Sequence, residues 1–258
     1  MTFKEKLKYF LKYPKRIMPI VFLNKIGFQL QISENIRDLC VGECIEVGAY
    51  SKPAALPYAT SIRYADTHTA NEAKKILEKH NNFRYHRGKF VEVDIIFKNN
   101  EPPLISLEDD SVDTVFSNQS LEHSSNPIAA LMDYIRVIKK GGIVYTVIPN
   151  KSYTFDVNRK TTSLSKLIEK YKSDNWEFTL EEFEELIQNS LDHDHFPDKS
   201  HEKIIEAFEK NDGTNHIYCF DEESTLELIL FLSSQVKIKL ILFDTTSKSN
   251  IHFALKKI

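Results

Sequence analysis

The sequence predicts an α/β fold with an open, doubly wound sheet. From residue 43 onward, short apolar runs alternate with segments of helical spacing, which is typical of parallel strands joined by crossover helices. The chain has 258 residues, of which 41% are hydrophobic, so it can bury a full core. It contains no run of about 20 uncharged apolar residues, so we expect no membrane span and a cytoplasmic location.

The elements of this core, residues 41–150, follow from the apolar pattern. Strands are expected at Glu43–Val47, Ile62–Asp66, Phe90–Val93, Thr114–Ser117 and Ile143–Ile148. Helices are expected at Ala70–His80 and Ile128–Lys139, and the run Lys139-Lys140-Gly141-Gly142 is interpreted as the end of the second helix. Right-handed crossovers between such strands give a sheet that binds its ligand at the carboxyl ends of the strands.

Residues 1–40 are expected to form an N-terminal helical cap. This segment is rich in Lys and is interrupted at Pro14 and Pro19, which favours a broken amphipathic helix. Its basic face either points to water or makes peripheral contact with a membrane or an anionic partner.

Residues 151–215 are charged and helical in pattern and are expected to form a lid inserted after the fifth strand. Candidate helices are Leu164–Tyr171 and Leu180–Ser190. Residues 216–258 then complete the core with a helix at Glu222–Ser233 and two apolar runs, Val236–Phe243 and Ile251–Lys256, which can pair as an antiparallel hairpin.

Composition excludes several classes of protein. Lys and Arg number 34 against 37 Asp and Glu, a net charge of -3, so no nucleic-acid partner is expected. The seven glycines form neither a GxGxxG nor a GxxxxGK loop, which argues against P-loop NTPases and ordinary NAD enzymes. Three cysteines in a chain of this length indicate reduced thiols rather than a disulfide framework.

Acidic and polar residues follow four of the expected strands. They are Glu46 with Gly48, Asp66, Asp94, and the segment from Asn118 to His123. An acid at the end of the second strand can accept hydrogen bonds from both hydroxyls of a ribose. An acid after a strand, taken alone, is more often a helix cap than a ligand.

Taken together and in this order, these segments resemble the class I S-adenosylmethionine-dependent methyltransferases, especially bacterial methyltransferase-domain proteins of surface-glycan biosynthesis. The matching segments are Glu46-Val47-Gly48, Tyr64-Ala65-Asp66, Val93-Asp94, Asp113-Thr114-Val115, Leu121-Glu122-His123, Lys140-Gly141-Gly142 and Ile148-Pro149-Asn150. The resemblance implies a Rossmann-like seven-stranded sheet with an antiparallel last strand. It also implies S-adenosylmethionine as cofactor and S-adenosylhomocysteine as product.

The resemblance assigns cofactor binding to a set of residues at the strand ends. They are Glu46, Gly48, Ala49, Tyr50, Asp66, Thr67, Asp94, Ile95, Asn118 and Gln119. In this assignment Asp66 holds the ribose, and Asp94 and Ile95 flank the adenine. Tyr50 and Lys52 stand where the family has further glycines. If these side chains fill the cleft, the alternative is a catalytically inactive, methyltransferase-like binding or scaffold protein.

An acceptor hydroxyl would require a base, and histidine is suited to this at neutral pH. The candidates are His123, which follows the fourth strand, His195 of the inserted segment, and His216 directly after that segment. Acceptor binding is expected of Tyr153, Asp156 and Arg159, which follow the fifth strand. Capping, packing or a solvated surface remains the alternative for each of these residues.

A metal site is the other interpretation of the inserted segment. The residues concerned are Asp192, His193, Asp194, His195, Asp198 and His201 and, just beyond the segment, His216. Imidazole and carboxylate bind Zn, Mn or Fe, but the segment has no HExxH pattern and no Cys partner. No metal site is therefore assigned from the sequence.

The resemblance leads to a specific functional expectation. The protein is expected to O-methylate a sugar hydroxyl, or a phosphoramidate-type group, of a bacterial capsule or surface-polysaccharide precursor. Its partner would thus be a small-molecule or glycan-precursor acceptor.

Overall fold

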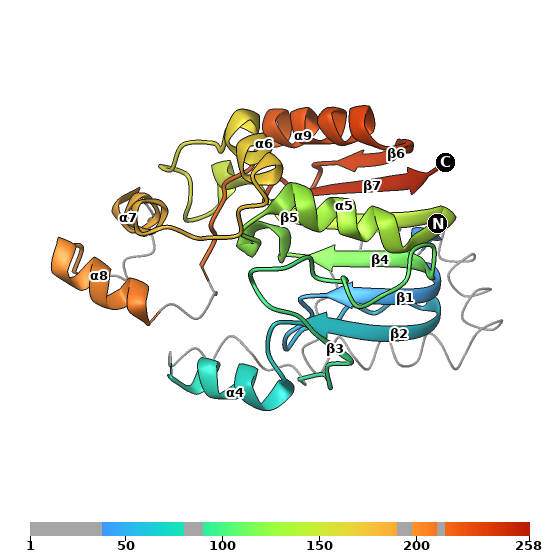
Figure 1. The fold of residues 1–258 in the computed structure, drawn as a ribbon, viewed down its shortest axis with the longest axis horizontal. Helices are drawn as coiled ribbons and strands as arrows, with labels where there is room; N and C mark the ends of the chain where they lie inside the picture. The colour runs from blue at the N-terminus through green and yellow to red at the C-terminus, as the bar shows by residue number, and fades with distance from the viewer. Residues whose placement is uncertain (1–37, 80–89, 190–197, 211–214) are drawn as a thin grey trace.

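The computed structural model describes residues 38–79, 90–189, 198–210 and 215–258 (Figure 1). The expected N-terminal helix, His193 and His195 lie outside these residues. The strands are β1 Val41–Val47, β2 Tyr58–Asp66, β3 Ile95–Ile96, β4 Val112–Asn118, β5 Ile138–Pro149, β6 Ile238–Asp244 and β7 Asn250–Lys257. The α-helices are α4 Ala70–Lys79, α5 Pro127–Val137, α6 Leu164–Lys172, α7 Leu180–Asn189, α8 His201–Glu209 and α9 Glu222–Gln235. Two short 3-10 helices are η2 Leu121–His123 and η3 Lys151–Tyr153.

The strands form a seven-stranded sheet in the order β3-β2-β1-β4-β5-β7-β6. Strands β1 to β5 pair in parallel, whereas β7 runs antiparallel to both β5 and β6. The expected doubly wound fold with an antiparallel last strand is confirmed. Strands β1 and β4 are neighbours, but the chain continues from β1 to β2 on one side and from β4 to β5 on the other, so the strand order reverses between them. Doubly wound sheets bind their ligands at such a point.

Both faces of the central strands are buried. Alternate residues such as Ile45 and Val115 pack with α5, α6 and α9, whereas Cys44, Phe116 and Tyr145 face a second cluster on the opposite side. This division follows from the two-residue period of a strand. Packing on both faces therefore fixes the central strands, whose carboxyl ends carry the candidate site.

The described part of the segment between β5 and α9 contains the helices η3, α6, α7 and α8, joined by loops. Helices α7 and α8 pack on each other through Phe183, Leu186, Ile187 and Ile204. Figure 1 shows both helices on the side toward which β1, β2 and β4 point. They therefore lie beyond the carboxyl edge of the sheet. Helix α8 was not expected from the sequence.

Two expected boundaries were wrong. The third strand is limited to Ile95–Ile96, and the described residues before it, 90–93, form no strand. The run Lys139 to Gly142 does not end α5, because α5 stops at Val137 and these residues already belong to β5. Gly141 has φ +83°, and the pairing with β4 shifts register here, so the glycines form an irregularity at the start of the strand.

None of the helices in the described part of the chain is both long and apolar enough to cross a bilayer.

Candidate active site

The turn after β1 depends on Gly48. Its φ is +74°, and a Cβ atom there would lie 2.5 Å from Oγ of Ser120, the residue just before η2. Only glycine combines this backbone conformation with so close an approach. The glycine therefore brings the turn after β1 into contact with the turn after β4.

Glu46 supports this turn from inside the sheet. Its side chain is buried, and both carboxylate oxygens accept the backbone N–H of Ala54, at 2.8 and 3.0 Å. Burial raises the pKa of Glu46 to about 8, although the hydrogen bond from Ala54 opposes the shift. The structure thus gives Glu46 a contact with the loop that follows Gly48, and direct contact with a cofactor stays a prediction.

Asp66 lies beside the glycine turn, at the end of β2. The N–H of Gly48 donates to the carbonyl of Ala65 at 2.9 Å, and the Asp66 carboxylate accepts the N–H of Thr67 at 2.7 Å. Burial raises the pKa of Asp66, and the N–H of Thr67 opposes this shift. A glycine turn next to a strand-end acid is the arrangement that ribose hydroxyls require, so these residues fit S-adenosylmethionine.

The next residues of the turn pack against their surroundings. Ala49 is buried, and its carbonyl accepts the N–H of Lys52 at 2.9 Å. Tyr50 has φ 50°, and its hydroxyl donates to the carbonyl of Ala73 in α4 at 3.2 Å. The Tyr50 side chain is thus anchored on α4.

The remaining residues expected at the cofactor lie in two places. Asp94 comes immediately before β3, and its exposed carboxylate accepts the N–H of Tyr64 at 2.8 Å, while Ile95 is buried in β3. Gln119 follows Asn118 at the end of β4, with φ 53° and its amide donating to Asn250 at 2.8 Å. Their contacts with a cofactor stay predictions.

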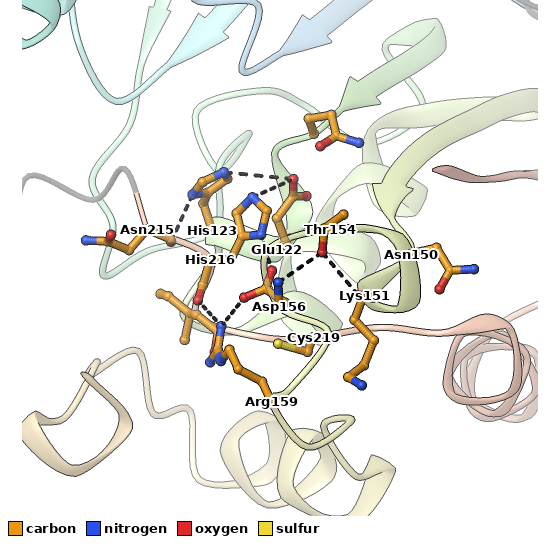
Figure 2. Close-up of polar contacts among 12 residues, drawn as sticks. Glu122, His123, Asn150, Lys151, Thr154, Asp156, Arg159, Asn215, His216 and Cys219 are labelled. Atoms are coloured by element: carbon orange, nitrogen blue, oxygen red, sulfur yellow. Dashed lines mark hydrogen bonds and ion pairs between the residues drawn. The ribbon is translucent and has the colours of Figure 1, made fainter. Parts of the chain in front are cut away.

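Two of the three candidate histidines meet. Nε2 of His123 and Nε2 of His216 each lie 3.8 Å from Oε1 of Glu122 (Figure 2). The two imidazole rings are in edge contact, with centroids 4.9 Å apart. We refer to Glu122, His123 and His216 as the histidine cluster.

Backbone hydrogen bonds explain how His216 reaches η2. The carbonyl of Glu122 accepts the N–H groups of Ile217 and Tyr218 at 2.8 and 3.2 Å, and Phe220 accepts the N–H of Lys151 at 2.8 Å. The segment 215–220 is therefore tied to η2 on one side and to the end of β5 on the other. This tie places the histidine cluster at the carboxyl edge of the sheet.

The second nitrogen of each ring has an acceptor. Nδ1 of His216 lies 2.7 Å from Oδ2 of Asp156, and Nδ1 of His123 lies 2.9 Å from the carbonyl of Asn215. Burial would raise the pKa of Asp156, but His216 and Arg159 hold it below its ordinary value, so its carboxylate is ionised. Both Nδ1 atoms therefore donate, and the Nε2 atom of each ring faces Glu122.

Arg159 does not have the role expected of it. Its guanidinium is 3% exposed and donates to Asp156, to Glu185 and to the carbonyls of His216 and Ile217. These contacts use all five N–H groups of the side chain. Arg159 cannot therefore bind an acceptor in this arrangement and instead positions Asp156 and the segment that carries His216.

Asp156 also differs from the expectation. Its side chain is buried and contacts His216 and Arg159, which makes it a positioning residue for the histidine rather than a surface contact for an acceptor. Tyr153 in η3 is 56% exposed, and its contact with an acceptor stays a prediction. Phe155 stacks on His216 with ring centroids 4.7 Å apart. His195 lies outside the described residues.

Glu122 is the member of the site that sequence reasoning missed. It is fully buried, and neither of its carboxylate oxygens has a hydrogen-bond partner within the described ranges. Burial raises the pKa of Glu122 to about 7, although the nearby His216 opposes the shift. The sequence did indicate Glu122 through the segment Leu121-Glu122-His123, which resembles class I methyltransferases. That resemblance did not predict a contact with His216.

Comparisons with known proteins agree with the fold. Residues 45–146 match the family model described as a methyltransferase domain. No curated protein matches the chain. A SAM-dependent methyltransferase from Methanosarcina mazei is similar at 14% identity over 89% of this chain and 99% of its own, with a TM-score of 0.46.

Two further solved structures are similar to this chain. A SAM-dependent methyltransferase from Aquifex aeolicus is 14% identical over 84% of this chain and 82% of its own, with a TM-score of 0.42. A Rhodobacter sphaeroides protein provisionally described as a Zn-dependent alcohol dehydrogenase is 13% identical over 91% and 92%, with a TM-score of 0.53. At these identities the likeness concerns the fold alone.

The region that matches the family model contains the Gly48 turn, Asp66 and η2, which are the parts of the site that fit the cofactor. Residues 45–146 therefore form a methyltransferase domain, and the strand-end residues of this domain fit S-adenosylmethionine as cofactor.

Proposed function

We propose that the methyl acceptor is a hydroxyl oxygen, and that it belongs to a sugar or a phosphoramidate-type group of a bacterial capsule or surface-polysaccharide precursor. The observation that supports oxygen as the acceptor is the Asp156–His216 pair, whose contact is 2.7 Å, at the carboxyl edge of the sheet. The resemblance to surface-glycan methyltransferases supports the class of acceptor.

The cofactor, when bound, supplies an electrophilic methyl group on a sulfonium. A hydroxyl is a weak nucleophile at neutral pH, and a positioned base that removes its proton typically adds about 10²–10⁴ in rate. Nε2 of His216 can take this proton, because Nδ1–H is held by Asp156. The ionised Asp156 then stabilises the imidazolium that forms.

The histidine cluster lies close to the cofactor turn in space. Ser120 contacts Gly48, and η2 with Glu122 and His123 starts at the next residue. An acceptor placed at the cluster would thus lie beside the turn assigned to the cofactor. Such alignment can be worth roughly 7–11 kcal/mol of the barrier to a two-substrate reaction.

The test combines an acceptor screen with two groups of variants. Purified protein with methyl-labelled cofactor is offered sugar nucleotides, glycan precursors and their phosphoramidate derivatives, with tRNA and peptides as other acceptor classes. We expect label on a glycan hydroxyl or a phosphoramidate-type group. His123→Ala and His216→Gln should lower turnover and leave cofactor affinity, measured by calorimetry, nearly intact.

The cofactor arm uses Asp66→Ala. This variant should weaken cofactor binding at least tenfold, or about 1.4 kcal/mol, because it removes the carboxylate assigned to the ribose. Labelling of nucleic acid or of peptide nitrogen alone would reject the proposed acceptor. Full activity of both histidine variants would reject the base.

A further inference from the structure

We infer that Glu122, His123 and His216 bind one divalent transition-metal ion such as Zn²⁺ or Mn²⁺. The candidate ligand atoms of these three side chains all lie within 4.8 Å of one another. Two imidazoles and one carboxylate form a ligand set that proteins use for such ions, with coordination positions left open for a substrate.

The distances are close to those that a metal site requires. Ligand atoms at about 2.1 Å from a tetrahedral ion lie about 3.4 Å apart. Nε2 of His123 and Nε2 of His216 are each 3.8 Å from Oε1 of Glu122. A movement of a few tenths of an ångström would bring each of these pairs to the separation of metal ligands.

The buried carboxylate of Glu122 supplies a second, independent argument. Both of its oxygens are without hydrogen-bond partners among the residues that the structure describes, and the side chain is 0% exposed. Leaving such a group unsatisfied costs about 1–3 kcal/mol, and more when it is charged. A cation held between Glu122 and the two rings would remove this cost.

The surroundings of the two rings form a third argument. Ligating histidines generally donate their other N–H to a carboxylate or a backbone carbonyl, which fixes the tautomer. His216 does so to Asp156 and His123 to the carbonyl of Asn215, at 2.7 and 2.9 Å (Figure 2). Two Nε2 atoms and a carboxylate oxygen thus converge on one point, where a cation can bind all three.

The catalytic consequence rests on the proposed function. A hydroxyl coordinated to the ion has a lowered pKa, so its O–H bond breaks with the electron pair left on oxygen and the proton released to solvent. In the metal-loaded protein the ion, rather than His216, activates the acceptor hydroxyl. His216 is then a metal ligand, and Asp156 orients its ring. Metal binding itself requires neither the cofactor nor an acceptor.

The test therefore measures metal binding alone. The full chain is stripped with a chelator, the chelator is removed, and Co²⁺ is added while the visible absorption is recorded, followed by competition with Zn²⁺. We expect one ion per chain and the intense visible bands of a four- or five-coordinate site with nitrogen ligands. The shared carboxylate should matter most, so Glu122→Gln should weaken binding by at least about 100-fold, and Asp156→Asn by about 10–100-fold.

His201→Gln is the matched control. This ring is 70% exposed and pairs with Glu184 of α7 rather than with the histidine cluster, so its loss should leave Co²⁺ affinity unchanged. Circular dichroism verifies that each variant is folded. The spectrum of the wild-type complex is a second measurement that does not depend on any variant.

Three results would overturn the inference. They are absence of binding up to about 1 mM Co²⁺, binding that Glu122→Gln and His216→Gln leave unchanged, and a weak spectrum typical of six oxygen ligands. A stripped enzyme that methylates at the full rate would overturn the catalytic use of the ion. Specific metal binding without methylation of any glycan hydroxyl would support the site and reject the proposed acceptor.

Discussion

Oδ2 of Asp156 lies 2.7 Å from Nδ1 of His216, although Asp156 precedes helices α6 to α8 in the chain and His216 follows them. The contact fixes which nitrogen of His216 bears the proton, and it directs Nε2 toward Glu122. The orientation of this ring is therefore decided by a residue that need not touch either substrate.

Asp156→Asn should lower turnover by about 10²–10⁴, the usual worth of a positioned base. The Asn side chain keeps the shape, but its amide can donate to Nδ1 and so move the ring proton to Nε2. Cofactor affinity should be unchanged, because the side-chain hydrogen bonds of Asp156 within the described ranges go to the histidine and Arg159. Turnover and cofactor titration are compared with those of Asp198→Asn, an exposed acid that accepts hydrogen bonds from Ser200 rather than from the histidine cluster. Equal turnover in the two variants would show that the pair has no catalytic role.

Gly48→Ala and Gly141→Ala separate crowding from backbone strain. Both glycines have positive φ, +74° and +83°, but an added Cβ meets Ser120 at 2.5 Å only at Gly48 and has nothing within 4 Å at Gly141. Gly141→Ala should lower the free energy of unfolding by about 1–2 kcal/mol, because the alanine has to adopt a positive φ but meets no neighbouring atom. Gly48→Ala should cost more and weaken cofactor binding.

The double variant Gly48→Ala with Ser120→Gly completes this comparison. Removing the Ser120 side chain leaves its Cα at 3.8 Å from the new Cβ, so part of the loss should be recovered. Urea unfolding and cofactor titration measure the two effects. A Gly48→Ala protein as stable as Gly141→Ala would contradict the close approach of the two turns.

Glu46→Gln should change how stability depends on pH. The folded pKa of Glu46 is raised to about 8, above its ordinary value of 4.5, chiefly by burial. Between these two values the folded state holds a proton that the unfolded state has lost, so the free energy of unfolding of the wild type falls as pH rises. Gln stays neutral and lacks this contribution.

The melting temperature of the wild type, relative to Glu46→Gln, should therefore decline as pH rises from about 4.5 to 8 and level off above that. Differential scanning calorimetry of both proteins across this range provides the measurement, and other titrating groups cancel in the difference. A difference that is constant with pH would show that Glu46 ionises normally in the fold.

Arg159→Ala should destabilise the fold by about 3–5 kcal/mol, because it leaves the buried Asp156 carboxylate without its compensating charge. The matched control is Lys160→Ala at the next residue, whose side chain is exposed and should change stability by less than about 0.5 kcal/mol. Urea unfolding distinguishes the two. If Arg159→Ala left stability intact and raised only the KM for the acceptor, the positioning role would be wrong. Arg159 would then bind the acceptor, as the sequence predicted.

Much of the fold was predictable because its signals are local. The apolar runs at β1, β4 and β5 and the helical spacing at α5 and α9 identify buried elements whatever the rest of the chain does. The third strand was misplaced because only Ile95–Ile96 pair with β2, and so short a pairing leaves no periodic pattern. The glycines at 141 and 142 were assigned to a helix end because a helix cap and a strand irregularity use the same residue type.

The sequence by itself determined most of the strands and helices and the strand ends where Gly48, Asp66 and His123 lie, because periodicity and turn residues act over a few positions. Only the tertiary structure decided that His216 joins Glu122 and His123. That contact depends on hydrogen bonds from the backbone N–H groups of residues 217 and 218 to the Glu122 carbonyl, across long sequence separations. Hydrogen bonds of this kind leave no pattern in the chain, because any residue except proline can supply a backbone N–H.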